Sequence, residues 1–169
     1  ELWGYDGIFP ERIMRFFHEG HPQAWTNLEP LCSVNIYLHP PGVISHDATD
    51  TQFKLIETLD GIELNQNTKA LPRAFLVGSV RVFDSAEALF DAMRAPAFNP
   101  LDAVLTEAPP SVELPNSSGA ELGQAQVLER RPRNVRIKVD ATTSCYLVLT
   151  DAFFPGWNAR IDGEPSEIF

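Results

Sequence analysis

The chain has 169 residues, and its 13 Lys and Arg against 23 Asp and Glu give a net charge of −10. A chain of this length forms one domain, or two small ones that share a core, and folds without a metal or disulfide. The net negative charge repels phosphate backbones, so we do not expect a nucleic-acid partner. The 14 Pro and 10 Gly make a smaller share than the roughly 25–30% of disordered chains. We expect a globular protein that is rich in turns.

Both ends have the features of a segment cut from a longer protein. Residue 1 is Glu, and residues 162–169 are typical of a tight turn followed by a strand that has only begun. No run approaches the roughly 18 apolar residues that span a bilayer. No basic-then-apolar leader opens the sequence. We therefore expect a soluble piece of a larger protein.

The first elements are a short helix, a strand and a hairpin. Ile13, Phe16 and Phe17 fall on one face of a helical pattern. Residues 33–38 alternate as a strand does. A further strand pair is predicted on either side of Asp60-Gly61, over residues 52–59 and 62–66, because this dipeptide tolerates the positive φ angles of a two-residue turn.

Residues 74–107 predict a strand–helix–strand unit. The first strand covers residues 74–83, with Gly78 as a bulge or bend. Asp84 is expected to cap the helix with Glu87 three residues on, and the second strand covers residues 102–107. Such a unit usually has two parallel strands.

The pattern after residue 107 is a loop followed by strands. Residues 108–120 are rich in Pro, Ser, Gly and Asn and predict a linker or long surface loop. Residues 134–139 alternate between polar and apolar side chains, and residues 145–149 are typical of a central strand. Residues 157–161 with the following Asp-Gly turn predict a hairpin whose second strand starts at Ile168.

The expected fold class is α+β and mainly β. Residues 1–110 form a mixed α/β part, and residues 111–169 form an antiparallel β-sandwich-like module of the jelly-roll or immunoglobulin-like kind. The acidity lies mainly in the first part, with 7 basic and 15 acidic residues, against 6 and 8 in the second.

No pattern identifies a metal site, a cofactor site or a catalytic residue. The side chains that could supply metal ligands are His18, His21, His39, His46, Asp47 and Asp50. They lack the HExxH or paired Cys-x-x-Cys spacing that makes ligands converge. A Gly-x-Ser-x-Gly elbow and Gly-rich phosphate loops are also absent. With 23 acids in the chain, a chance carboxylate pair is expected and marks no hydrolase site.

The state of the two cysteines, Cys32 and Cys145, has two interpretations. Free cysteine is among the most buried residue types, which favours two buried thiols. A single long-range disulfide is the alternative, because spacing alone does not decide pairing.

A basic group stands out in this acidic chain. It consists of Arg130, Arg131, Arg133, Arg136 and Lys138. These side chains could face anionic lipid headgroups or an anionic glycan. The favoured reading is that Arg136 and Lys138 cover the solvated face of their strand, since one face of an antiparallel sheet is normally wet.

An aromatic segment follows the predicted central strand. Trp157 and Phe154 could stack on the apolar face of a sugar, while Asp151 and Asn158 offer hydrogen-bond partners. These four residues are the candidate glycan-binding site. The alternative, and the favoured reading, is that Trp157 fills the core, because large aromatic side chains dominate cores.

Three segments of the chain share motifs, in the same order, with one known family. Residues 147–163, LVLTDAFFPGWNARIDG, resemble the LVLSD-x-YYPGW-x-A-x-VDG signature of the YfhO family of bacterial multi-pass membrane proteins. Residues 70–77, ALPRAFLV, are similar to its ALPRAFLV segment, and residues 4–10, GYDGIFP, to the lead-in after its membrane helices. The family has further strands after the Asp-Gly turn, so the resemblance implies a module that is incomplete at its carboxyl end.

The resemblance implies a polytopic bacterial membrane protein related to the glycosyltransferases that use lipid-linked sugars, with this chain as its extracytoplasmic carboxyl-terminal region. Catalytic acids of such enzymes usually lie in amino-terminal loops outside this chain. The leading hypothesis is therefore a non-catalytic domain that binds or positions a glycan or lipid-linked sugar. The alternatives are a stand-alone secreted glycoside hydrolase with an Asp/Glu pair, and a purely structural cap on membrane helices.

Overall fold

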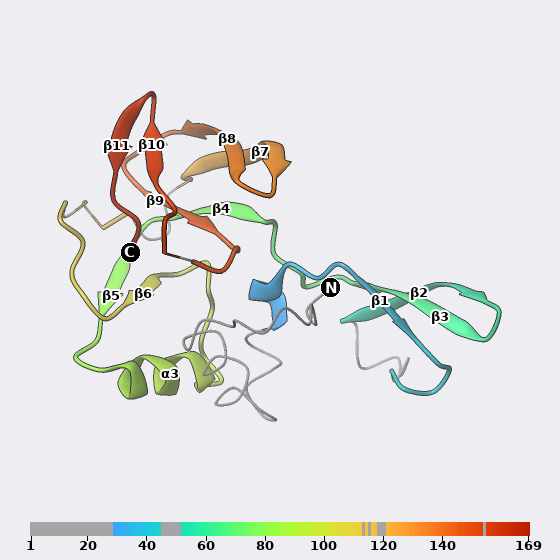
Figure 1. The fold of residues 1–169 in the computed structure, drawn as a ribbon. Helices are drawn as coiled ribbons and strands as arrows, with labels where there is room; N and C mark the ends of the chain where they lie inside the picture. Colours follow the sequence, from blue (N-terminus) through green and yellow to red (C-terminus); the bar gives the residue numbers. More distant parts are fainter. Residues whose placement is uncertain (1–28, 45–51, 113, 115, 118–120, 154) are drawn as a thin grey trace.

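The computed structural model describes residues 29–44, 52–112, 114, 116–117, 121–153 and 155–169 (Figure 1). The fold is mainly β and consists of several small sheets with one described α-helix. The predicted helix around Ile13, Phe16 and Phe17 lies outside the described residues. The predicted division at residue 110 stays a prediction.

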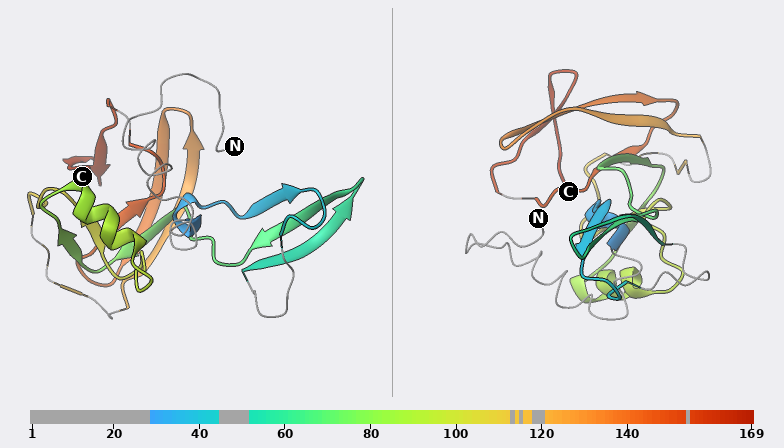
Figure 2. Two further views of the ribbon diagram at one scale, coloured as in Figure 1. Left: turned by 90° about the horizontal axis from the view of Figure 1, so that it is seen from below. Right: turned by 90° about the vertical axis from the view of Figure 1, so that its right-hand side faces the viewer.

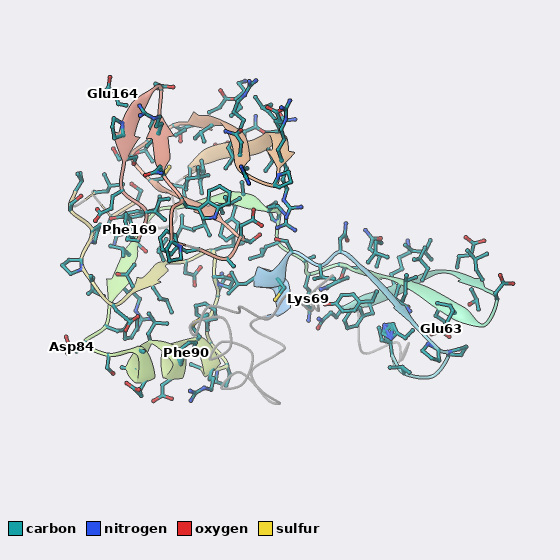
Figure 3. All side chains as sticks on the ribbon, in the orientation of Figure 1. Glu63, Lys69, Asp84, Phe90, Glu164 and Phe169 are labelled. Carbon is teal, nitrogen blue, oxygen red and sulfur yellow. The ribbon has the colours of Figure 1, made fainter. Side chains whose placement is uncertain are left out.

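A three-stranded antiparallel sheet extends to one side of the molecule (Figures 1 and 2). Its strands are β1 (Ile36–His39), β2 (Phe53–Leu59) and β3 (Ile62–Asn67), and β3 lies in the middle. The predicted Asp60-Gly61 hairpin is confirmed, since β2 pairs with β3 and both turn residues have positive φ angles, 49° and 76°. Glu63 marks the outer part of this sheet in Figure 3.

Strand β1 begins three residues later than predicted. A short 3-10 turn, η1 (Glu29–Cys32), precedes it, and Ser33 has a φ of 52°, in the left-handed region that interrupts an extended chain. Within β1 the covered face is aromatic, because the ring of Tyr37 packs edge-on against Phe53 at 5.3 Å between centroids. Leu38, on the opposite face, is 68% exposed.

The buried centre of the fold is the antiparallel pair of β4 (Ala74–Val77) and β9 (Tyr146–Leu149). All four residues of β4 are buried, as expected for an uninterrupted apolar run. The prediction of a central strand at residues 145–149 is wrong in one respect. Leu147 of β9 is 44% exposed, so the covered strand of the pair is β4.

The predicted strand over residues 74–83 is divided into β4 and β5 (Val80–Val82) by a break at Gly78. The backbone N–H of Ser117 donates to the Gly78 carbonyl oxygen at 2.8 Å. A Cβ atom at Gly78 would lie 2.6 Å from the Ser117 carbonyl oxygen. The break therefore admits the long loop after residue 107, and only glycine allows so close an approach.

The strand–helix–strand prediction is confirmed. Strand β5 pairs in parallel with β6 (Val104–Thr106), and α3 (Ala86–Arg94) connects them. The predicted cap at Asp84 is wrong. The cap is Ser85, whose extended backbone lets its hydroxyl accept from the Ala88 N–H at 3.2 Å.

The longest hairpin pairs β7 (Gly123–Arg131) with β8 (Asn134–Ala141). The predicted alternation in β8 is confirmed through Ile137, since its apolar side chains there are partly covered and its charged ones exposed. Strand β7 was not predicted. Its register shifts between Val127 and Glu129, while its burial alternates through to Glu129. Leu128 is exposed and Glu129 is partly covered, so polarity does not follow burial and the sequence does not reveal the strand.

The last hairpin is tighter than predicted. Strand β10 (Ala159–Ile161) pairs with β11 (Glu164–Ser166), so the second strand starts at Glu164 and not at Ile168. A two-residue turn places its partner strand directly after it. The remaining tail returns to the buried centre, where the Phe169 ring packs edge-on against Tyr146 at 5.8 Å (Figure 3).

A second anchor holds the tail to the loop after β6. The Ser111 hydroxyl and backbone N–H both donate to one Glu167 carboxylate oxygen, at 2.6 and 2.9 Å. These two hydrogen bonds lower the pKa of the Glu167 carboxyl.

Cys32 and Cys145 are free thiols, each partly exposed, and burial raises the pKa of Cys145.

The first prediction compares two glycines with nearly the same φ, 92° at Gly123 and 91° at Gly163. A Cβ atom at Gly123 would overlap the Asp140 carbonyl oxygen, whereas one at Gly163 meets open space. Both Ala variants should lose about 1 kcal/mol for left-handed backbone, and Gly123→Ala a further roughly 1–3 kcal/mol for overpacking. Urea unfolding measures the difference. Equal losses would contradict the close contact at Gly123.

Candidate functional site

An open hollow of about 410 Å³ lies between the turn of the β7–β8 hairpin and the segment that follows β9. We call it the Trp157 hollow. Its lining residues are Arg130, Arg131, Pro132, Val135, Asp151, Ala152 and Trp157. Two sequence-distant parts of the chain therefore build it.

Local structure presents each part of the lining. Arg130 and Arg131 end β7, after the bulge that shifts its register. Asp151 is the second residue after β9, and Trp157 precedes β10 after Gly156, whose φ is 106°. Trp157 is partly buried, so it neither fills the core nor projects into solvent.

An ion pair holds Asp151, one of the residues that line the hollow. Arg73 Nη1 donates to Asp151 Oδ1 at 2.5 Å, and the Asp151 side chain is only 19% exposed. The residues stand beside the paired strands, because Arg73 precedes β4 and Asp151 comes two residues after β9. The Thr150 N–H donates to the Arg73 carbonyl oxygen at 2.9 Å and extends the strand pairing to this point.

Positive charge gathers around the hollow. Arg130 Nη2 lies 3.6 Å from Asp151 Oδ1, and Arg131 Nη2 lies 2.5 Å from Glu129 Oε1. The β7–β8 hairpin contains five basic residues and two acidic ones, a net charge of +3 in a chain of −10. Lys138 pairs with Asp140 at 2.9 Å on the exposed part of the hairpin. Arg136 and Lys138 are exposed, as predicted for the solvated face of their strand. Arg130 and Arg131 line the hollow.

The four candidate glycan contacts are placed differently. Trp157 and Asp151 line the same hollow. Asn158 is exposed and does not line it, and its side-chain amide donates to the Gly156 carbonyl oxygen at 3.0 Å. Phe154 lies outside the described residues. Its neighbour Phe153 is 56% exposed.

Sequence reasoning missed the role of Arg73, which lies 78 residues before Asp151. The signal was present, because Arg73 and Asp151 lie in the two segments of the resemblance, residues 70–77 and 147–163. Only the antiparallel register of β4 and β9 shows that these two residues meet.

A second hollow of about 440 Å³ lies beside Arg73. Its lining is mostly polar and includes Ser33, Asn35, Gln66 and Asn67. The Ser33 and Thr150 hydroxyl oxygens are 2.7 Å apart, so this hollow and the Asp151 segment adjoin.

The described residues hold no group of three or more potential metal ligands. His39 lies in β1, and the other five candidate ligands lie outside the described residues. Among the described residues, Asp151 is the single carboxylate that lines the Trp157 hollow. No helix in the described part of the chain is long and apolar enough to cross a membrane.

Comparison with protein families, with curated proteins and with solved structures finds no match for this chain.

The second prediction concerns the energy of the Arg73–Asp151 pair. A double-mutant cycle with Arg73→Gln and Asp151→Asn should give a coupling of about 1 kcal/mol or more in urea unfolding, because the pair is mostly covered and charge-assisted. The matched control is Lys138→Gln with Asp140→Asn, whose side chains are 57% and 52% exposed. That pair should couple by less than about 0.5 kcal/mol. Equal couplings would refute a special role for Asp151.

Proposed function

We propose that this chain is a non-catalytic extracytoplasmic domain of a bacterial membrane protein resembling the YfhO family. It assists the handling of a glycan or lipid-linked sugar by binding or positioning it. The membrane is a partner through helices of the parent protein outside this chain. The observation that supports this function best is the meeting of Trp157, Arg130 and Asp151 in one open hollow.

The lining suits a carbohydrate. A pyranose has an apolar face of C–H bonds and an edge of hydroxyl groups. Trp157, Pro132 and Val135 supply apolar surface. Arg130 supplies donors and Asp151 acceptors for hydroxyl groups. Ligand sites commonly combine apolar walls with a few placed polar groups.

The strand pairing supports the resemblance to the family. Residues 70–77 include β4, and residues 147–163 include most of β9. The two strands are hydrogen-bonded partners in this fold. Segments that resemble one family are therefore spatial neighbours, as parts of one structural unit would be.

We also propose a sandwich-like arrangement for the carboxyl-terminal module. The β7–β8 hairpin lies alongside the β4–β9 pair (Figures 1 and 2), which supports two facing β layers. A jelly-roll or immunoglobulin-like topology is the finer form of this proposal.

The hydrolase alternative receives no comparable support. Glycoside hydrolysis needs two carboxyl groups across the scissile bond. Among the described lining residues, Asp151 is alone, and Arg73 holds it at 2.5 Å. The structural-cap alternative differs from the proposal in a single respect, because it binds no sugar.

The third prediction tests sugar binding. Trp157→Ala should lose binding on a glycan array while the far-UV spectrum and the cooperative unfolding persist, because the ring is a partly covered wall of the hollow. The matched control is Phe153→Ala, an exposed ring that does not line the hollow. Binding that survives Trp157→Ala would contradict this site. A wild-type chain that binds no glycan would favour the structural cap.

The fourth prediction tests the membrane parent. The reading frame upstream of Glu1 should encode successive apolar segments of about 20 residues, the length that spans a bilayer as a helix. Reading the genomic sequence checks this. A reading frame without such segments would refute the membrane part of the proposal. Sugar binding would still be tested by the glycan array.

A further inference from the structure

We infer that the Trp157 hollow takes a sugar with an anionic group, a carboxylate or a phosphate, and that Arg130 binds this group. The inference rests on the proposed function, because it requires a sugar beside Trp157. It adds the chemical class of the ligand and the side chain that recognises it.

The first step is the excess positive charge around Asp151. Asp151 Oδ1 lies 2.5 Å from Arg73 and 3.6 Å from Arg130. One carboxylate thus faces two guanidinium groups. Arg73 has the hydrogen-bonded geometry, while the Arg130 separation exceeds normal hydrogen-bond length. Asp151 Oδ1 therefore balances mainly the charge of Arg73, and the charge of Arg130 is only partly balanced.

The second step excludes the neighbouring arginine. Arg131 pairs with Glu129 at 2.5 Å, which balances its charge. Arg130 is 58% exposed and lines the hollow, so a ligand reaches its guanidinium at low desolvation cost. The planar guanidinium matches the geometry of carboxylate and phosphate oxygens.

The third step comes from the other side of the lining. Pro132, Val135 and Trp157 give apolar surface beside the cation. A bare anion would leave this surface unused, and a neutral sugar would leave the Arg130 charge in water. A ligand with both a C–H face and an anionic group uses both parts of the hollow.

The experiment compares pairs of sugars with and without an anionic group, using the 169-residue chain at low salt. The carboxylate arm is trigalacturonate against its methyl ester. The phosphate arm is glucose 6-phosphate against glucose, with inorganic phosphate as the bare anion. Binding is followed by calorimetry and by the tryptophan indole N–H signals. The charged sugar should bind about tenfold or more tighter than its neutral partner, as a charge-assisted hydrogen bond requires. The difference should shrink with added salt.

The variant Arg130→Gln should bind charged and neutral sugars alike. The matched control is Arg94→Gln, which removes one positive charge on α3 and away from the hollow, and should keep the preference. Arg130→Lys keeps the charge but not the planar fork and should show an intermediate preference. It also covers the case in which Arg130→Gln fails to fold.

The outcomes separate the inference from the proposed function. Equal binding of charged and neutral sugars would overturn the anionic ligand and leave sugar binding in place. Equal loss of preference in Arg130→Gln and Arg94→Gln would overturn the role of Arg130. Inorganic phosphate that binds as tightly as glucose 6-phosphate, or no binding of any sugar, would overturn the proposed function itself. A preference in one arm alone identifies the anionic group.

Discussion

The antiparallel pairing of β4 with β9 is the constraint on which the rest of the structure depends. It buries all of β4, and the Thr150–Arg73 hydrogen bond extends it to the point where Arg73 meets Asp151. A buried strand is stable only when its backbone groups are paired, so β9 is required for this core. The same pairing delivers Asp151 to the hollow. Stability and the candidate site therefore share one set of contacts.

The charge of the chain is unevenly distributed around the hollow. The chain has a net charge of −10, yet the β7–β8 hairpin has a net charge of +3 and brings two arginines to the hollow. This charge already includes Glu129, and the nearby Asp151 reduces it further without removing it. An acidic protein thus presents a basic rim at one place, beside its one described tryptophan.

Elements with a strong local signal were predicted from the sequence. The Asp60-Gly61 turn, the helix containing Leu89 and the alternation in β8 depend on neighbouring residues alone, and all are present. The missed or misplaced elements depend on distant contacts. Strand β7 exposes Leu128 and partly covers Glu129, the break at Gly78 reflects the approach of Ser117, and Phe169 turns back onto Tyr146. None of these contacts has a signature within a short window.

For the candidate site, the sequence by itself indicated an aromatic segment, an acid before it and a basic strand, but not Arg73. It also determined a mainly β fold, because alternation and turn residues are local properties. Only the tertiary structure decided which of them meet. It placed Trp157 at a wall and not in the core, left Asn158 outside the hollow, and joined Arg73 to Asp151 across 78 residues. The reason is that register between distant strands is set by packing of the whole sheet, and no short segment contains it.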